Sequence, residues 1–210
     1  MSRTVVHLLR HGEVDNPEGI LYGRLPGFCL SDVGVRQAEQ VAAHLGDHDV
    51  VHVVASPLLR AQQTAAPIAA KHGLDLVTDD GLIEAGNVFE GTRVSVRDGA
   101  LRDPRSWPKL GNPFRPSWGE PYRDVAARML AAMETAREAA AGREAVCVTH
   151  QLPIWVTRRV AEGRRLWHNP AMRECALGSV TSFTYSGGQL TGVSYTVPAR
   201  RQVTLDDAAQ

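Results

Sequence analysis

The chain has 210 residues and equal numbers of basic and acidic side chains, 23 of each, so its formal net charge is zero. This balance argues against general binding to nucleic acid or anionic membranes, which needs a basic surplus. No apolar run approaches the length of a membrane span and no signal-peptide core is visible, so a cytoplasmic location is expected. The three cysteines are too few and too widely spaced for a disulfide framework or a zinc ribbon.

The first predicted element is a buried strand that runs directly into a reactive turn. Residues 4–9, T-V-V-H-L-L, form the mostly apolar run of a strand covered on both faces. Arg10, His11 and Gly12 follow at once, where open α/β sheets bind their ligands, outside the carboxyl ends of the strands. Arg10 offers a forked donor suited to phosphate or carboxylate, and His11 offers a nucleophile or a base.

Apolar periodicity and turn residues predict alternating helices and strands along the rest of the chain. After a long loop, the expected elements are a helix from Ser31 to about Gly46, a strand at 50–55, a helix with Ser56 as N-cap and Pro57 as first residue, a strand at 74–77, a long helix from Pro121, a strand at 145–149, a helix from Pro153 to about Ala161, and two antiparallel strands at 179–185 and 189–197.

This order of elements predicts an α/β fold: a three-layer open sheet, mostly parallel, with helices on both faces. Residues 92–120 are rich in proline and arginine, so we expect an irregular or helical insertion, at about 86–120, over the carboxyl edge of the sheet. The polar residues 199–210 are expected to be a tail on a single domain that spans 1–198.

Three of the predicted strands are each followed by a side chain that can bind or attack a phosphate. His11 follows the first strand, Arg60 lies one turn beyond the strand at 50–55, and His150 follows the strand at 145–149. The carboxyl ends of such strands lie side by side in a doubly wound sheet. Together with Arg10, these residues would place two arginines and two imidazoles in one pocket. With helix N-termini beside it, such a pocket suits a dianion, and phosphate is its natural ligand.

Five segments carry a family resemblance: L-L-R-H-G-E at 8–13, L-S-D-V-G-V-R-Q-A at 30–38, S-P-L-L-R-A-Q-Q-T-A at 56–65, E-A-G-N-V-F-E-G at 84–91 and V-T-H at 148–150. Their order and spacing resemble those of the histidine phosphatase superfamily, which includes cofactor-dependent phosphoglycerate mutase. The resemblance implies that His11 is the nucleophile that becomes a phosphohistidine. It also implies that Arg10, Arg60 and His150 bind the phosphoryl oxygens, with Asn16 as a further contact.

The same resemblance implies that Glu84 is the acid that protonates the leaving oxygen and then activates water. Glu90 is the rival for this role. Gln151 is expected at the substrate, although mutases of the family tend to have glycine after the second histidine. No cofactor and no metal are expected in the reaction, because the arginines supply the positive charge.

The expected activity is hydrolysis of a phosphomonoester of a small metabolite. A cofactor-dependent phosphoglycerate mutase is the alternative, and a non-catalytic phosphate-binding protein is a distant third. The oligomeric state stays open, a homodimer included.

Four further histidines are interpreted without a catalytic role. His44 and His48 are four residues apart and could share a helix face, but no third ligand has a motif-like spacing, so a metal site is not favoured there. His7 and His52 lie inside predicted strands and are expected to be satisfied histidines of the core or of an interface.

Overall fold

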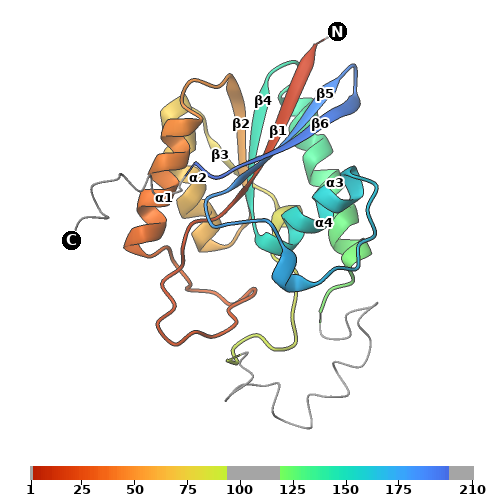
Figure 1. The fold of residues 1–210 in the computed structure, drawn as a ribbon. Helices are drawn as coiled ribbons and strands as arrows, with labels where there is room; N and C mark the ends of the chain where they lie inside the picture. Colours follow the sequence, from red (N-terminus) through yellow and green to blue (C-terminus); the bar gives the residue numbers. More distant parts are fainter. Residues whose placement is uncertain (1, 94–118, 199–210) are drawn as a thin grey trace, which may run out of the picture.

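The computed structural model describes residues 2–93 and 119–198 (Figure 1). The predicted tail at 199–210 and most of the predicted insertion lie outside these residues. Among the residues described, no helix has both the length and the apolar character that crossing a lipid bilayer requires.

The strands of the described residues form one mixed sheet in the order β3-β2-β4-β1-β5-β6. Their bounds are β1 (Arg3–Arg10), β2 (Val50–Ala55), β3 (Leu76–Thr78), β4 (Glu144–Thr149), β5 (Val180–Ser186) and β6 (Gln189–Thr196). The neighbours from β3 to β1 are parallel, whereas β5 and β6 run antiparallel. The predicted open, mostly parallel sheet is therefore confirmed, and so is the predicted antiparallel pair, which is β5 and β6.

Helices cover both faces of the sheet, which confirms the predicted three layers. Helices α1 (Asp32–His44) and α2 (Leu59–His72) lie on one side, and α3 (Tyr122–Ala139) and α4 (Gln151–Ala161) on the other (Figure 1). Two short 3₁₀ turns, η1 (Asp80–Leu82) and η4 (Pro170–Met172), precede irregular segments.

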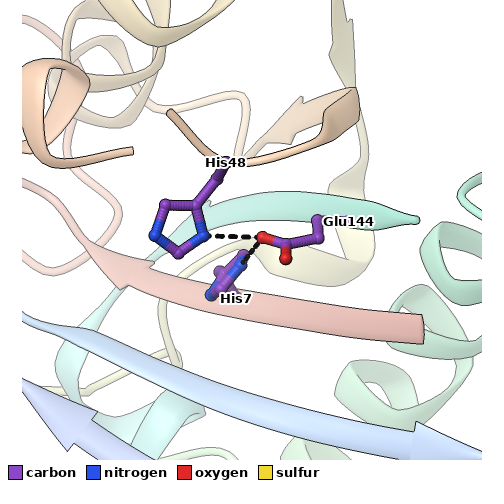
Figure 2. A group of neighbouring side chains, drawn as sticks. All are labelled: His7, His48 and Glu144. Atoms are coloured by element: carbon purple, nitrogen blue, oxygen red, sulfur yellow. Dashed lines mark hydrogen bonds and ion pairs between the residues drawn. The ribbon is translucent and has the colours of Figure 1, made fainter. Parts of the chain in front are cut away.

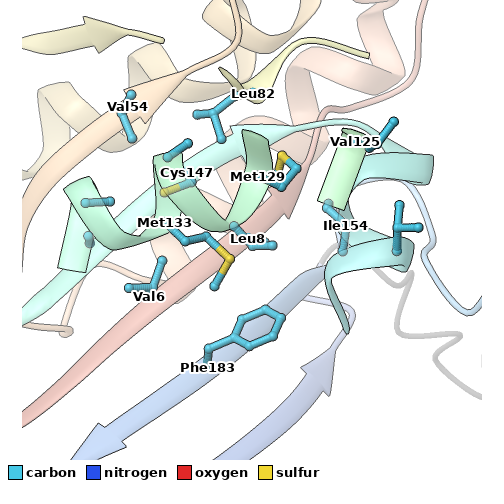
Figure 3. Packing of buried hydrophobic residues seen from close by; sticks show 14 of the residues in the cluster. Val6, Leu8, Val54, Leu82, Val125, Met129, Met133, Cys147, Ile154 and Phe183 are labelled. Atoms are coloured by element: carbon cyan, nitrogen blue, oxygen red, sulfur yellow. The ribbon is translucent and has the colours of Figure 1, made fainter. Parts of the chain in front are cut away.

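Each face of the sheet buries its own core because side chains alternate along a strand. Leu8 packs with Met129 and Met133 of α3 and with Ile154 of α4 (Figure 3). The next residue of β1, Leu9, points the other way, into a second core with side chains of α1 and α2. All of these residues are essentially inaccessible to solvent. The two cores fix β1 on both faces and so fix the position of the turn that follows it.

Helix α2 begins later than predicted. Its N-cap is Leu58, which makes no side-chain capping bond, rather than Ser56. Ser56 is fully buried, and its hydroxyl lies 2.8 Å from Nε2 of His150. The prediction was wrong because Ser56 serves only the turn before the helix: its hydroxyl accepts from the N–H of Leu58 at 3.4 Å and also bonds to the buried imidazole of His150.

Helix α4 begins at Gln151, two residues before the predicted Pro153, and His150 is its extended N-cap residue. No loop therefore separates the end of β4 from the helix. The first turn of α4 brings its free N–H groups and the positive end of its dipole to the carboxyl edge of the sheet. Strand β3 is also shorter than predicted, since it starts at Leu76.

Candidate active site

A pocket of about 220 Å³ opens at the carboxyl edge of the sheet. It is lined by residues from the end of β1, the loop after it, the segment after η1, the start of α3, the first turn of α4 and the segment after η4. Those used below are Arg10, His11, Tyr22, Glu84, Gln151 and Arg173. The side chains of Arg60 and His150 lie directly behind it and are fully buried.

The imidazole of His11 is held in one tautomer. Its Nδ1 lies 2.7 Å from the carbonyl oxygen of Gly12. Because a carbonyl can only accept, Nδ1 carries the hydrogen and the lone pair is on Nε2. The ring is 2% exposed, and burial, together with the charges of Arg60 and Arg10, lowers the pKa of His11 to about 3. His11 is therefore a neutral imidazole with a free lone pair.

Close packing of the backbone fixes the turn that holds this ring. The backbone N–H of Gly12 donates to Oγ1 of Thr64 at 3.1 Å. A Cβ atom on Gly12 would lie 2.6 Å from the carbonyl oxygen of Gly34 in α1. Only glycine allows this approach, so β1, α1 and α2 together set the position of His11.

His150 lies beside His11, with their ring centroids 5.1 Å apart. Nη2 of Arg60 is 3.4 Å from Nδ1 of His150, and a guanidinium can only donate. Nδ1 is therefore the acceptor, and Nε2 donates to Oγ of Ser56 at 2.8 Å. Burial, and then the closeness of His11 and of the charged Arg60, hold the pKa of His150 well below its usual value. This second imidazole is also neutral.

Two guanidinium groups with unused donors lie beside this pair, of which Arg60 is buried and Arg10 is partly exposed. Nη2 of Arg60 donates to the carbonyl oxygen of Gly23 at 2.7 Å, and Nη1 of Arg10 donates to that of Cys175 at 2.5 Å. The Nε atoms of both arginines are buried and have no hydrogen-bond partner among the described residues. Buried donors without partners are rare in folded proteins, and they suit a ligand that brings several acceptor oxygens.

The two candidate acids lie in different surroundings. Glu84 lines the pocket, and its Oε1 accepts from its neighbour, the N–H of Ala85, at 2.8 Å. Burial raises the pKa of Glu84, while the charges of nearby arginines oppose that rise. Glu90 instead accepts from the N–H of Asn87 at 3.0 Å and does not line the pocket of the described residues. The geometry favours Glu84 as the acid.

The other two predicted site residues differ in placement. Gln151 lines the pocket from the first turn of α4. Asn16 uses both ends of its amide within its own loop, where Nδ2 donates to the carbonyl oxygen of Ile20 at 2.9 Å and Oδ1 accepts from the N–H of Ile20 at 3.2 Å. Asn16 would have to break these bonds to reach a ligand, and it is not among the residues that line the pocket.

Among the pocket residues that sequence reasoning did not predict, Arg173 and Tyr22 bear on the chemistry of the site. Arg173 lines it, and its Nε donates to Nε2 of His168 at 2.8 Å. Tyr22 also lines it, with the guanidinium carbon of Arg60 4.7 Å from the centroid of its ring. Both come from irregular segments, where no strand end or helix cap marks them in the sequence. The only available signal for Tyr22 is the unusual length of its loop.

The fold and this pocket define an α/β protein with two neutral imidazoles and two arginines at the carboxyl edge of its sheet. Residues 6–198 match the model of the histidine phosphatase superfamily (branch 1). The uncharacterized protein Rv0525 of Mycobacterium tuberculosis is 61% identical over 198 residues, which cover 94% of this chain and 98% of that protein. The chain therefore belongs to the histidine phosphatase superfamily, as the resemblance in sequence predicted.

Two further comparisons give a partial likeness in sequence and a likeness in fold. A 2,3-bisphosphoglycerate-dependent phosphoglycerate mutase of Thermoplasma acidophilum is 45% identical over 80 residues, which are 38% of this chain and 40% of that protein. Among solved structures, the mycobacterial glucosyl-3-phosphoglycerate phosphatase Rv2419c has a TM-score of 0.73 at 24% identity, over 93% of this chain and 98% of that one. The second likeness is one of fold.

Proposed function

We propose that this protein is a phosphomonoesterase that transfers the phosphoryl group of a small metabolite to His11 and then to water. The observation that carries the proposal is the neutral, oriented imidazole of His11 beside the unpartnered Nε donors of Arg10 and Arg60. A lone pair on Nε2 can attack phosphorus in line, and the two guanidinium groups offset the charge on the equatorial oxygens.

The proposed reaction has two steps. In the first, the bond from Nε2 of His11 to phosphorus forms as the ester P–O bond breaks, and the carboxylic acid of Glu84 gives its proton to the leaving oxygen. In the second, the carboxylate of Glu84 takes a proton from water, the resulting hydroxide attacks phosphorus, and the P–N bond breaks. The raised pKa of Glu84 supports the first step, because it keeps the acid protonated to a higher pH.

Trapping of the phosphoenzyme tests this proposal. Acid-labile, base-stable label from a radiolabelled phosphomonoester should accumulate on the parent protein, and it should vanish in His11→Gln together with nearly all turnover. His52→Gln, which removes an imidazole from β2, is the matched control and should label normally. A His11→Gln protein that turns over and takes up label would refute the mechanism.

We also propose that turnover needs no metal, because the arginines supply the positive charge of the site. Extensive dialysis against EDTA should leave the hydrolysis of p-nitrophenyl phosphate unchanged, and vanadate should inhibit it as a mimic of five-coordinate phosphorus. Activity that disappears with EDTA and returns with magnesium or zinc would show that the chemistry is metal-assisted.

A phosphoglycerate mutase is the second candidate, supported by the partial identity to the Thermoplasma enzyme. A mutase retains its bisphosphate intermediate, whereas a phosphatase admits water to the phosphohistidine. The two are separated by supplying 3-phosphoglycerate with and without 2,3-bisphosphoglycerate as primer. Primer-dependent formation of 2-phosphoglycerate, faster than release of phosphate, would favour the mutase. No release of phosphate from any ester would instead leave a phosphate-binding protein.

A further inference from the structure

A second group of chemically competent side chains lies away from the pocket, toward the amino ends of β2 and β4 (Figure 2). His7 comes from β1, Glu144 is the first residue of β4, and His48 lies between α1 and β2. One carboxylate oxygen, Oε2 of Glu144, is 2.8 Å from Nε2 of His7 and 2.7 Å from Nδ1 of His48. Glu144 begins β4 and His150 follows its last residue, so these two residues are roughly 20 Å apart, whereas His7 in β1 is roughly 13 Å from His11.

We propose that His7, His48 and Glu144 form a binding site for a divalent transition cation of the zinc class. Two imidazole nitrogens and one carboxylate oxygen are a set of ligands that zinc prefers and that magnesium and calcium do not. Each residue offers one ligand atom, and these atoms lie within 4.8 Å of one another. Ligands of a tetrahedral zinc ion are about 3.3 Å apart, so small side-chain shifts would suffice.

Binding of a cation at this site would change the tautomer of both imidazoles. In the structure Glu144 accepts a hydrogen bond from each imidazole, so Nε2 of His7 and Nδ1 of His48 carry hydrogens. A cation would bind these same two nitrogens, so the hydrogen of each ring would move by way of solvent to the other nitrogen, Nδ1 of His7 and Nε2 of His48, and both imidazoles would stay neutral. Three protein ligands leave a fourth position, which water or the exposed His44 can take, since the rings of His44 and His48 have centroids 5.8 Å apart.

The site has the supporting contact that bound imidazoles usually have. The second nitrogen of His7, Nδ1, lies 2.8 Å from Oγ of Ser182 in β5. A hydroxyl group can both donate and accept, so it can hold His7 in the tautomer that leaves Nε2 for the ion. The side chain of His7 is 4% exposed and that of His48 is 36% exposed. The site is therefore rigid on its inner side and open to solvent at His48.

The same three residues could instead form a hydrogen-bonded network that joins β1, β4 and the turn before β2 without a metal. Measured binding of a metal ion separates these two interpretations. The metal-free, untagged protein should bind one Co²⁺ and develop the intense visible bands of a tetrahedral site, and Zn²⁺ should displace it. Zn²⁺ should also raise the midpoint of thermal unfolding, whereas Mg²⁺ should not.

Single substitutions test which residues bind the ion. His48→Gln changes a half-exposed residue outside the helices and strands, so the protein should fold, and its affinity for Zn²⁺ should fall by roughly 100-fold or more. Ser182→Ala, which removes only the supporting contact, should weaken binding by about 10-fold. His52→Gln is the matched control, because His52 lines a cavity on the α3 side of the sheet and should bind as the parent does.

Two results would overturn this proposal. The first is the absence of the cobalt bands and of zinc binding in the parent protein, which would leave a hydrogen-bonded network. The second is binding that survives His48→Gln but is lost in His11→Gln, which would place the ion in the active-site pocket. Neither result depends on whether the protein is a phosphatase, because metal affinity and thermal stability are measured without substrate.

Discussion

Replacement of His11 should make the protein more resistant to acid. The pKa of His11 is about 3 in the folded protein, against an ordinary value of 6.5. Below pH 6.5 the unfolded chain therefore takes up a proton that the folded protein refuses, so stability present at neutral pH is lost as the pH falls toward 3. One pKa unit corresponds to about 1.36 kcal/mol, and pH 5 is about 1.5 units below 6.5. Keeping His11 neutral should therefore lower the free energy of unfolding by about 2 kcal/mol at about pH 5.

Urea unfolding, followed by circular dichroism between about pH 7 and pH 5, measures this effect. The free energy of unfolding of the parent protein should fall by about 2 kcal/mol more than that of His11→Gln over this interval. His150 is also held neutral by burial, but it titrates in both proteins, so the difference isolates His11. His11→Asn is the control, because its smaller side chain packs differently but also lacks the titration. A difference in the free energy of unfolding between the parent and the variants that stays constant from pH 7 to pH 5 would refute the reasoning.

Three further predictions concern the pocket and the turn beneath it. Glu84→Gln should slow the hydrolysis of alkyl phosphates by about 10²-fold or more, and that of p-nitrophenyl phosphate much less, because nitrophenolate leaves without a proton. Glu90→Gln should match the parent, and the reverse pattern would make Glu90 the acid. Arg173→Met removes a charge that lowers the pKa of Glu84, so that pKa should rise and the alkaline limb of the rate profile for an alkyl phosphate should move to higher pH; an unmoved limb would contradict the assignment. Gly34→Ala would place a Cβ atom 2.0 Å from the carbonyl oxygen of Glu13, so urea unfolding should show a loss of about 1–3 kcal/mol; an undiminished stability would mean that the turn yields.

The sequence was sufficient wherever a regular element leads directly into the site. The apolar runs of β1 and β4 predict buried parallel strands, and the topology of parallel strands brings their ends together. The sequence alone therefore predicts that Arg10, His11 and His150 lie close together, and in the structure the ring centroids of His11 and His150 are 5.1 Å apart. The helix cap at Ser31 was also predictable, since its side chain accepts from the N–H of Gly34 within the first turn.

The sequence was insufficient wherever contacts between distant segments decide the outcome. Ser56 has the local signature of a helix cap, but its hydroxyl also bonds to a histidine that is 94 residues away, and the helix begins later. Arg173 enters the pocket from an irregular segment whose path is set by packing and not by periodicity. The partners of His48 were also out of reach of the sequence: Glu144 lies 96 residues from His48 and becomes its neighbour because β4 lies beside β2.

The two histidine clusters show how surroundings, more than residue type, set the chemistry of an imidazole. At the carboxyl edge of the sheet, His11 and His150 lie beside guanidinium groups that disfavour a second positive charge, so the rings stay neutral and the site favours an anion. Toward the amino ends of the strands, the rings of His7 and His48 share a carboxylate, so the proposed ligand there is a cation. One sheet thus holds an anion site and a proposed cation site on the same two strands, β1 and β4.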